Sequence, residues 1–311
     1  MRGAGRRRVI DRWIPASTAY LASEKARESL AQDPYFPKWD SPWWHMTLLH
    51  ELGRAEAIPT SAAEAMLSAI EAKYVRFFPN AREPLPAGLD DRRDALCHCG
   101  LGNIYRTLRA CGLDLDARAP WMRAWFLYYQ LPDGGLNCRE EAYATGTSSS
   151  IQSTLPALEA VLDAGRPFTL AEEEFLDRGA EYLISRRLAR RLRDGRVMSE
   201  SFLRIGFPRF YDYDVLRGLS FLAAWSRSRR KTVPREAVAD SLSALSARFP
   251  DGRVRVEKAG LVAERGLNRS LDGKWSDGEA TRFPLLDSAR RVGEVSEVLT
   301  RRWAEVRSVL C

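Results

Sequence analysis

The sequence lacks several features that would place it in familiar classes. It contains no run of about 18 apolar residues, so we expect no membrane-spanning helix. The basic start at residues 1–8 is not followed by the apolar segment that a secretory signal needs. Five cysteines occur in 311 residues, and Cys97, Cys99 and Cys111 lie close together rather than in the even framework of a secreted disulfide protein. We therefore expect a cytoplasmic protein with reduced thiols.

The sequence has fewer acidic than basic residues, 41 against 48, and most of the basic residues are arginines. The formal net charge is +7 at pH 7, and arginine is densest within 186–196 and 227–231. Such clusters can bind nucleic acid. Acidic residues are interleaved nearby, however, which is typical of a solvated outer helix face. Nucleic acid is therefore not among the partners that we favour.

Two kinds of helix alternate along the chain. Short apolar helices begin about 50–60 residues apart, a period typical of repeat architectures in which no helix pair buries its apolar face alone. Longer, more charged helices lie between them. The short helices begin near Trp44, His98, Ser149 and Tyr213, and the longer ones end at Pro79-Asn80, Asp133-Gly134, Asp194-Gly195 and Asp251-Gly252.

This alternation predicts an all-α fold with an inner and an outer ring of helices. We predict a single-domain α/α toroid over residues 1–311, with 1–32 as a helical lead-in and 253–282 as an irregular or hairpin excursion. An open solenoid built from the same helix pairs is the alternative.

The stretch Trp121–Cys138 contains the clearest helix end. An aromatic-rich helix stops at Leu131-Pro132-Asp133-Gly134-Gly135, because proline lacks an amide hydrogen and glycine readily adopts a positive φ. The pattern Gln130-x-x-Asp133-Gly134-Gly135 resembles the Gln-x-x-Asp-Gly repeat of squalene and hopene cyclases and the Gly-Gly repeat of protein prenyltransferase β-subunits. The resemblance covers roughly residues 35–255 and implies an α/α toroid that binds an apolar, isoprenoid-like substrate.

The sequence departs from these families at their catalytic motifs. Class II cyclases use Asp-x-Asp-Asp, whereas Asp212-Tyr213-Asp214 is followed here by Val215. Prenyltransferases place zinc on an aspartate, a nearby cysteine and a late histidine, but no histidine follows His98. Cys97-His98-Cys99-Gly100 faintly resembles the Cys-His-Gly zinc motif of lanthionine synthetase cyclases. The resemblance therefore bears more on fold than on activity.

The repeat predicts where a site would lie. If the short helices are equivalent, their N-terminal ends converge on one mouth of the barrel, where backbone amides favour anions and thiolates. This rim would hold His45, His98, Cys99, Ser149, Ser150, Asp212 and Asp214, with Cys138 in the loop leading to it.

Cysteine and histidine at this rim point to a metal. Cys97-His98-Cys99 with Cys138 and an aspartate offers soft and borderline ligands suited to zinc. On a helix, side chains two residues apart point about 200° apart, so only one cysteine of the pair faces the cavity unless the segment is uncoiled. We predict His98, Cys99 and Cys138 as the ligands of a possible zinc ion. The alternative is that the cysteines are small core residues.

Two further sets of residues are candidates for the same cavity. Asp212 and Asp214 are predicted general acids, since a carboxylic acid kept protonated by its surroundings can protonate a substrate; their alternative role is to cap the following helix. Aromatic rings can line an apolar cavity and stabilise a cation. The predicted substrate-binding set is Trp39, Trp43, Trp44, Trp125, Tyr129, Phe210, Tyr211 and Tyr213.

The leading hypothesis is a prenyltransferase-like or terpene-cyclase-like enzyme with an isoprenoid-like substrate in a central aromatic cavity. Its chemistry would use an aspartic acid or a metal. The alternative is a non-catalytic α/α-barrel module that binds a peptide or a lipid tail. A third hypothesis, docking of nucleic acid or an acidic carrier domain, depends on charge alone.

Overall fold

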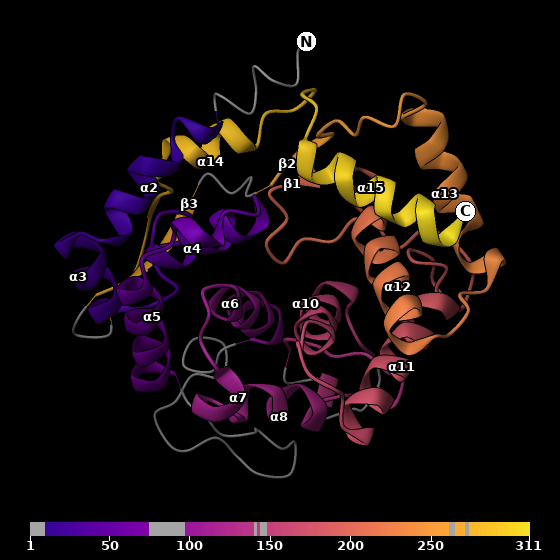
Figure 1. Ribbon diagram of the computed structural model, residues 1–311, viewed down its shortest axis with the longest axis horizontal. Coiled ribbons are helices and arrows are strands. Elements are labelled where there is room, and N and C mark those ends of the chain that lie inside the picture. Colours follow the sequence, from indigo (N-terminus) through magenta and orange to yellow (C-terminus); the bar gives the residue numbers. More distant parts are fainter. Residues whose placement is uncertain (1–9, 75–96, 140–141, 144–147, 261–264, 271–273) are drawn as a thin grey trace.

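The computed structural model describes residues 10–74, 97–139, 142–143, 148–260, 265–270 and 274–311. Within these ranges the chain forms 13 α-helices and two small sheets of two strands each (Figure 1). The predicted all-α class is therefore confirmed. Among the helices described, none is both long and apolar enough to cross a membrane.

The first half of the chain forms helices that follow one another around the left and lower parts of Figure 1. A short 3-10 helix covers Ala55–Ala57. The α-helices are α2 (Ile14–Leu21), α3 (Glu24–Gln32), α4 (Pro42–Glu51), α5 (Thr60–Lys73), α6 (His98–Ala110), α7 (Leu115–Arg118) and α8 (Trp121–Tyr128).

The second half continues this course on the right and returns at the top. A 3-10 helix covers Glu200–Leu203. The α-helices are α10 (Ile151–Leu162), α11 (Leu170–Ser185), α12 (Val215–Arg229), α13 (Arg235–Arg248), α14 (Pro284–Ala289) and α15 (Glu297–Leu310).

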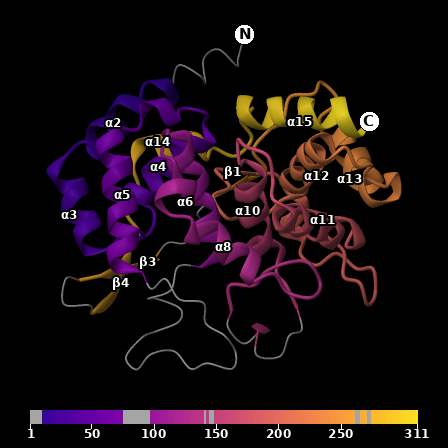
Figure 2. The ribbon, with the colours of Figure 1, turned by 60° about the horizontal axis from the view of Figure 1, so that its bottom comes forward.

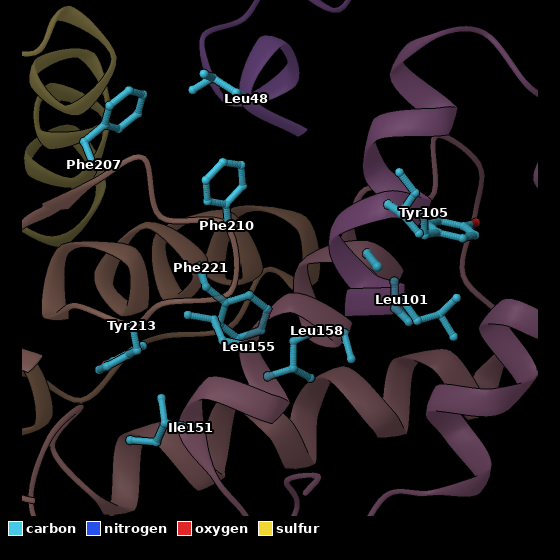
Figure 3. Close-up of a cluster of buried hydrophobic side chains, with 14 of the residues drawn as sticks. Leu48, Leu101, Tyr105, Ile151, Leu155, Leu158, Phe207, Phe210, Tyr213 and Phe221 are labelled. Carbon is cyan, nitrogen blue, oxygen red and sulfur yellow. The ribbon is translucent and has the colours of Figure 1, made fainter. Parts of the chain in front are cut away.

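Four helices, α4, α6, α10 and α12, lie nearer the centre than the others in Figure 1. Helix α6 packs against both α4 and α10, and α10 also packs against α11 and α12. These four are the helices whose starts the sequence repeat predicted. Their buried faces supply much of the core, including Leu48, Leu101, Leu155, Leu158 and Phe221 (Figure 3).

The strands are short and supply few of the core residues, among them Phe207. β1 (Gly206–Phe207) pairs in parallel with β2 (Lys258–Ala259). β3 (Arg265–Arg269) pairs antiparallel with β4 (Trp275–Glu279), within the segment for which we expected an irregular or hairpin excursion. Figure 2 shows this hairpin at the edge of the molecule. It packs on the loop before α4 through the rings of Phe36 and Trp275, whose centroids are 4.8 Å apart.

Two helices expected from the sequence are shorter in the structure. The helix expected over 169–192 ends at Ser185, because Arg187 and Leu188 take positive φ values of 43° and 68°. The single helix expected over 284–309 is divided into α14 and α15, and Gly293 lies between them with φ of 85°. The spacing of apolar residues in the sequence continues across both breaks. This spacing therefore gave no sign that the helices end there.

The segment 205–213 passes between α4 and α12 and brings its backbone into the interior. The Glu51 carboxylate, at the end of α4, accepts hydrogen bonds from the backbone amides of Arg209 (2.8 Å) and Phe210. Arg217 Nη1 donates to the carbonyl oxygens of Phe210 (2.7 Å) and Asp212 (2.8 Å). The segment is thus held from both sides by charged side chains.

Candidate metal centre

Three thiols meet where α6 begins. Cys97, Cys99 and Cys138 place their sulfur atoms within 4.8 Å of one another. The Cys97 and Cys99 Sγ atoms are 3.3 Å apart, and those of Cys99 and Cys138 are 3.6 Å apart. Cys138 is exposed and the other two are half-buried, so an ion could enter from solvent. We call these residues the thiol cluster.

The backbone at Cys97 explains why both cysteines of the Cys-x-Cys pair contribute. Cys97 is the N-cap of α6 and has an extended conformation, with φ −70° and ψ 153°; the helix itself begins at His98. The 200° separation expected for two helical residues therefore does not apply to this pair. Cys97 belongs in the cluster, although the predicted ligand set left it out.

Cys138 is brought to the cluster by the turn that ends α8. Gln130 Nε2 donates to the carbonyl oxygens of Gly134 (2.9 Å) and Phe175 (2.8 Å). The Asp133 carboxylate accepts from the Ser149 amide at 3.2 Å and forms an ion pair with Arg186 at 3.0 Å. Gln130 and Asp133 therefore tie the turn to the neighbouring helices.

The end of the same turn is fixed to α10. The Cys138 amide donates to Ser153 Oγ at 3.1 Å, and the Leu136 amide donates to Thr154 Oγ1 at 2.8 Å. Gly135 is needed here because a Cβ atom would lie 2.5 Å from the Ser149 Cβ. Since α10 also packs closely on α6, the thiol of Cys138 is held beside the start of α6.

One of the three thiols, that of Cys97, loses its proton more easily than the other two. The pKa of Cys97 is well below its ordinary value because the thiols of Cys138 and Cys99 and the Gly100 amide stabilise its thiolate, although burial opposes them. Contacts with Cys138 and Cys97, together with burial, raise the pKa of Cys99. The contact with Cys97, together with burial, raises that of Cys138 to about 12, although the contact with Cys99 opposes it. Removing the other two protons would place like charges side by side, and a bound cation would offset that repulsion. The three thiols lie close enough together to bind one.

The spacing of the sulfur atoms suits zinc. Zinc–sulfur bonds of about 2.3 Å in a tetrahedron place sulfur atoms about 3.8 Å apart. The separations of 3.3 and 3.6 Å are close to this value. Within the described part of the chain, the group contains these three residues and no fourth His, Cys, Asp or Glu. An ion held here would keep one position for another ligand, as catalytic zinc sites do.

His98, which we predicted as a ligand, is not part of the group. Its Nδ1 accepts from Trp125 Nε1 at 2.8 Å, and its Nε2 lies 3.0 Å from the Tyr143 hydroxyl. Burial lowers its pKa to about 4, so the ring is neutral and carries its proton on Nε2. The Tyr143 hydroxyl in turn donates to the carbonyl oxygen of Asn137. His98 therefore supports the segment that carries Cys138, and lies behind the thiols.

The two predicted acids occupy different environments. Asp214 is fully buried and caps α12: its carboxylate accepts from the amides of Arg217 (2.9 Å) and Gly206 (3.1 Å). This is the alternative role that the sequence allowed. Asp212 is half-buried, with Gln152 Nε2 3.4 Å from its Oδ1, and burial raises its pKa. A catalytic role stays a prediction for both, and the environment of Asp212 suits it better.

The predicted substrate-binding aromatics lie mainly in the core. The Trp44 ring packs edge-on against Trp39, Tyr35 and Phe210, with centroid separations of 4.5, 5.0 and 5.1 Å. Tyr213 donates its hydroxyl to the Leu188 carbonyl oxygen at 2.8 Å. Only Tyr211 of the predicted set is half-buried. The fully buried members are Trp39, Trp43, Trp44, Trp125, Tyr129, Phe210 and Tyr213.

Several residues of the arginine-rich segments form ion pairs. Arg187 and Arg190 both reach Asp240, at 3.3 and 3.0 Å. Arg229 reaches Asp177 at 3.2 Å and also pairs with Glu173. These pairs link neighbouring helices, the arrangement expected of a solvated helix face.

No protein-family profile, curated protein or solved structure matches this chain. The resemblance to cyclases and prenyltransferases therefore stays a prediction from short motifs, and the chemistry has to be argued from the thiol cluster and its surroundings.

Proposed function

We propose that the protein is a zinc-dependent enzyme with an α/α-toroid fold, in which Cys97, Cys99 and Cys138 hold the ion and a substrate takes its fourth position. The observation that carries the proposal is the convergence of three sulfur atoms within 4.8 Å of one another. They come from segments 39 residues apart, which chance packing of buried cysteines does not readily explain.

The course of the chain supports the toroid. Helices α4, α6, α10 and α12 lie toward the centre, with the other helices around them (Figure 1). The outer helices include both longer ones such as α11 and shorter ones such as α2, so the length difference expected from the sequence does not hold throughout. The C-terminal part returns to the N-terminal part, since α14 packs against α2. In such a ring the starts of the inner helices share one mouth, and the thiol cluster lies at the start of α6.

The surroundings of the cluster favour metal-assisted transfer to sulfur over acid catalysis. A soft, sulfur-rich ion binds and activates an incoming thiol as a thiolate. Burial raises the pKa of Tyr211, and the charges of Asp212, Cys99 and Cys97 add to this effect. We propose a thiol as the acceptor and an isoprenoid-like group, which the resemblance implies, as the group transferred to it from an activated donor. The carbon–sulfur bond forms as the bond between that carbon and the donor's leaving group breaks; the leaving group departs with the electron pair, and the thiol proton passes to solvent.

The second candidate is a non-catalytic binding module for a peptide or a lipid tail, in which the metal serves only structure. The capping role of Asp214 and the close packing of the aromatic side chains favour it. The two candidates differ in the fourth ligand of the ion. In a structural site the protein supplies this ligand, whereas a catalytic site leaves the position open for water or substrate.

Metal loading separates a true site from a chance cluster. Protein purified without chelator and equilibrated with Zn²⁺ is expected to retain one equivalent after desalting, measured by elemental analysis. Cys97→Ser, Cys99→Ser and Cys138→Ser are each expected to lose most of it, because a two-thiolate site binds zinc far more weakly. Cys111→Ser is the matched control and should retain the full equivalent. Wild-type protein that keeps less than about a tenth of an equivalent, or equal loss in the control, would refute the site.

A further inference from the structure

A second cluster of charged side chains lies in the interior, away from the thiols. Arg106 belongs to α6 and follows His98 by eight residues, which places it about 12 Å along the helix from the thiol cluster. We call the whole group the central arginine cluster. Its cations are Arg106, Arg209, Arg217 and Arg302, and its carboxylates are Glu51, Glu159 and Asp163.

Two of the arginines are fully paired. Glu159 accepts from Arg106 Nη1 at 2.7 Å and from Arg217 Nη2 at 2.7 Å. Arg106 Nε also donates to Asp163 at 2.6 Å. Although burial opposes it, these cations and Arg209 keep the pKa of Glu159 far below its usual value, so Glu159 is ionised. Its charge is shared between two guanidinium groups.

The other two arginines have no acidic partner among the residues that the structure describes. Arg209 is 6 % exposed, and its Nε and Nη1 atoms are buried without a hydrogen-bond acceptor in the described chain. Arg302 Nε is buried in the same way. The Glu51 carboxylate accepts from the backbone amides of Arg209 and Phe210.

The charge of the cluster does not balance. Four guanidinium groups face three carboxylates, and the Asp163 side chain is 48 % exposed, so water screens much of its charge. Burial, then the charges of Arg209 and Arg106, lower the pKa of Arg302 to about 10. His50, at the end of α4, adds no charge at neutral pH, since burial and Arg106 lower its pKa to about 3. A buried guanidinium without a partner is costly, and an anion would remove that cost.

We propose that Arg209 and Arg302 bind an oxyanion of the phosphate class in the interior of the protein. Guanidinium groups present planar pairs of donors that match phosphate oxygens. The site is independent of the zinc proposal, since it shares no residue with the thiol cluster.

Phosphate binding is testable by calorimetry and thermal unfolding at constant ionic strength. Inorganic phosphate is expected to bind saturably and to raise the Tm of the wild-type protein, with chloride as the ionic control. Arg209→Gln and Arg302→Gln should each weaken the affinity at least tenfold. Arg227→Gln removes an exposed arginine and should bind as the wild type does. Phenyl phosphate tests the source: equal binding indicates a site for a phosphate ester, and exclusion indicates free phosphate.

Stability in phosphate-free buffer gives a second readout. If Arg209 served only to stabilise the fold, its replacement would lower the Tm of the protein. We expect instead that Arg209→Gln unfolds at the same Tm as the wild type or at a higher one, because the substitution removes an uncompensated charge. No saturable effect of phosphate on the wild type, or equal affinity in both cluster variants and the wild type, would overturn the proposal. Loss of zinc binding in the cysteine variants would leave these results unchanged.

Discussion

Replacing Gly102 with alanine is expected to lower the free energy of unfolding by about 3 kcal/mol. Helices α6 and α10 make the most extensive helix pair, and a Cβ atom at Gly102 would lie 2.4 Å from the Pro156 carbonyl oxygen. The neighbouring atoms are also backbone, with the Ala157 nitrogen at 2.8 Å. Relief therefore requires the two helices to move apart. Helix propensity alone would make the alanine variant more stable by about 1 kcal/mol. A loss of stability would therefore show that the contact between α6 and α10 outweighs helix propensity.

Urea unfolding followed by circular dichroism measures this change. Gly278→Ala is the matched control, because no atom lies within 4 Å of a Cβ at Gly278 and the residue is exposed in β4. Its effect should stay within about 0.5 kcal/mol. We also expect the Gly102 variant to bind zinc more weakly, since Cys97 and Cys99 begin α6 whereas Cys138 is tied to α10 through Ser153. A Gly102→Ala protein as stable as the wild type would show that the helices are not packed as described.

Arg217→Met is expected to cost about 3–5 kcal/mol of unfolding free energy, the range for breaking a buried ion pair. The Arg217 side chain is 3 % exposed and pairs with Glu159 at 2.7 Å. It also donates to the carbonyl oxygens of Phe210 and Asp212. Methionine would leave Glu159 with one cation and leave both carbonyl groups without this donor.

Two comparisons make the Arg217 result specific. Arg217→Lys keeps the charge but not the forked donors of arginine. We therefore expect its unfolding free energy to lie between those of the wild type and of Arg217→Met. Arg209→Met removes a guanidinium that has no acidic partner and should cost far less. Chemical unfolding at pH 7 measures all three. A loss below about 1 kcal/mol for Arg217→Met would mean that the segment 205–213 does not depend on this ion pair.

The helical framework was predictable because local patterns encode it. Apolar spacing and turn residues located α4, α6, α10 and α12, and the Gln130–Gly134 pattern identified a turn that binds its neighbours. The interruptions at Arg187 and Gly293 were not predicted. Arg187 takes a positive φ that non-glycine residues rarely adopt, so its residue type gave no signal there, and the glycine at 293 was outweighed by the apolar periodicity around it. The bonds from Arg209 and Phe210 to Glu51 join residues 158 and 159 positions apart, which no local pattern reveals.

The candidate site was predicted in part. The sequence brought Cys99 and Cys138 to one rim, and the structure places them together. Cys97 was left out of the predicted ligands because two cysteines two residues apart on a helix point in different directions. In the structure Cys97 is the extended N-cap of α6, so this reason does not apply to it. The predicted ligands included His98, whose ring nitrogens instead engage Trp125 and Tyr143. Whether a residue is inside a helix or caps it depends on one pair of dihedral angles, which residue types alone do not fix.

X-ray absorption at the zinc edge, on protein loaded with one equivalent of Zn²⁺, tests the proposed centre most directly. We expect three sulfur ligands at about 2.3 Å and one lighter ligand. Cys138→Ser should show two sulfur ligands, and a small thiol such as 2-mercaptoethanol should replace the lighter ligand of the wild-type site with a fourth sulfur. A first shell without sulfur, or one that is the same in the wild type and in Cys138→Ser, would contradict a metal centre built from Cys97, Cys99 and Cys138.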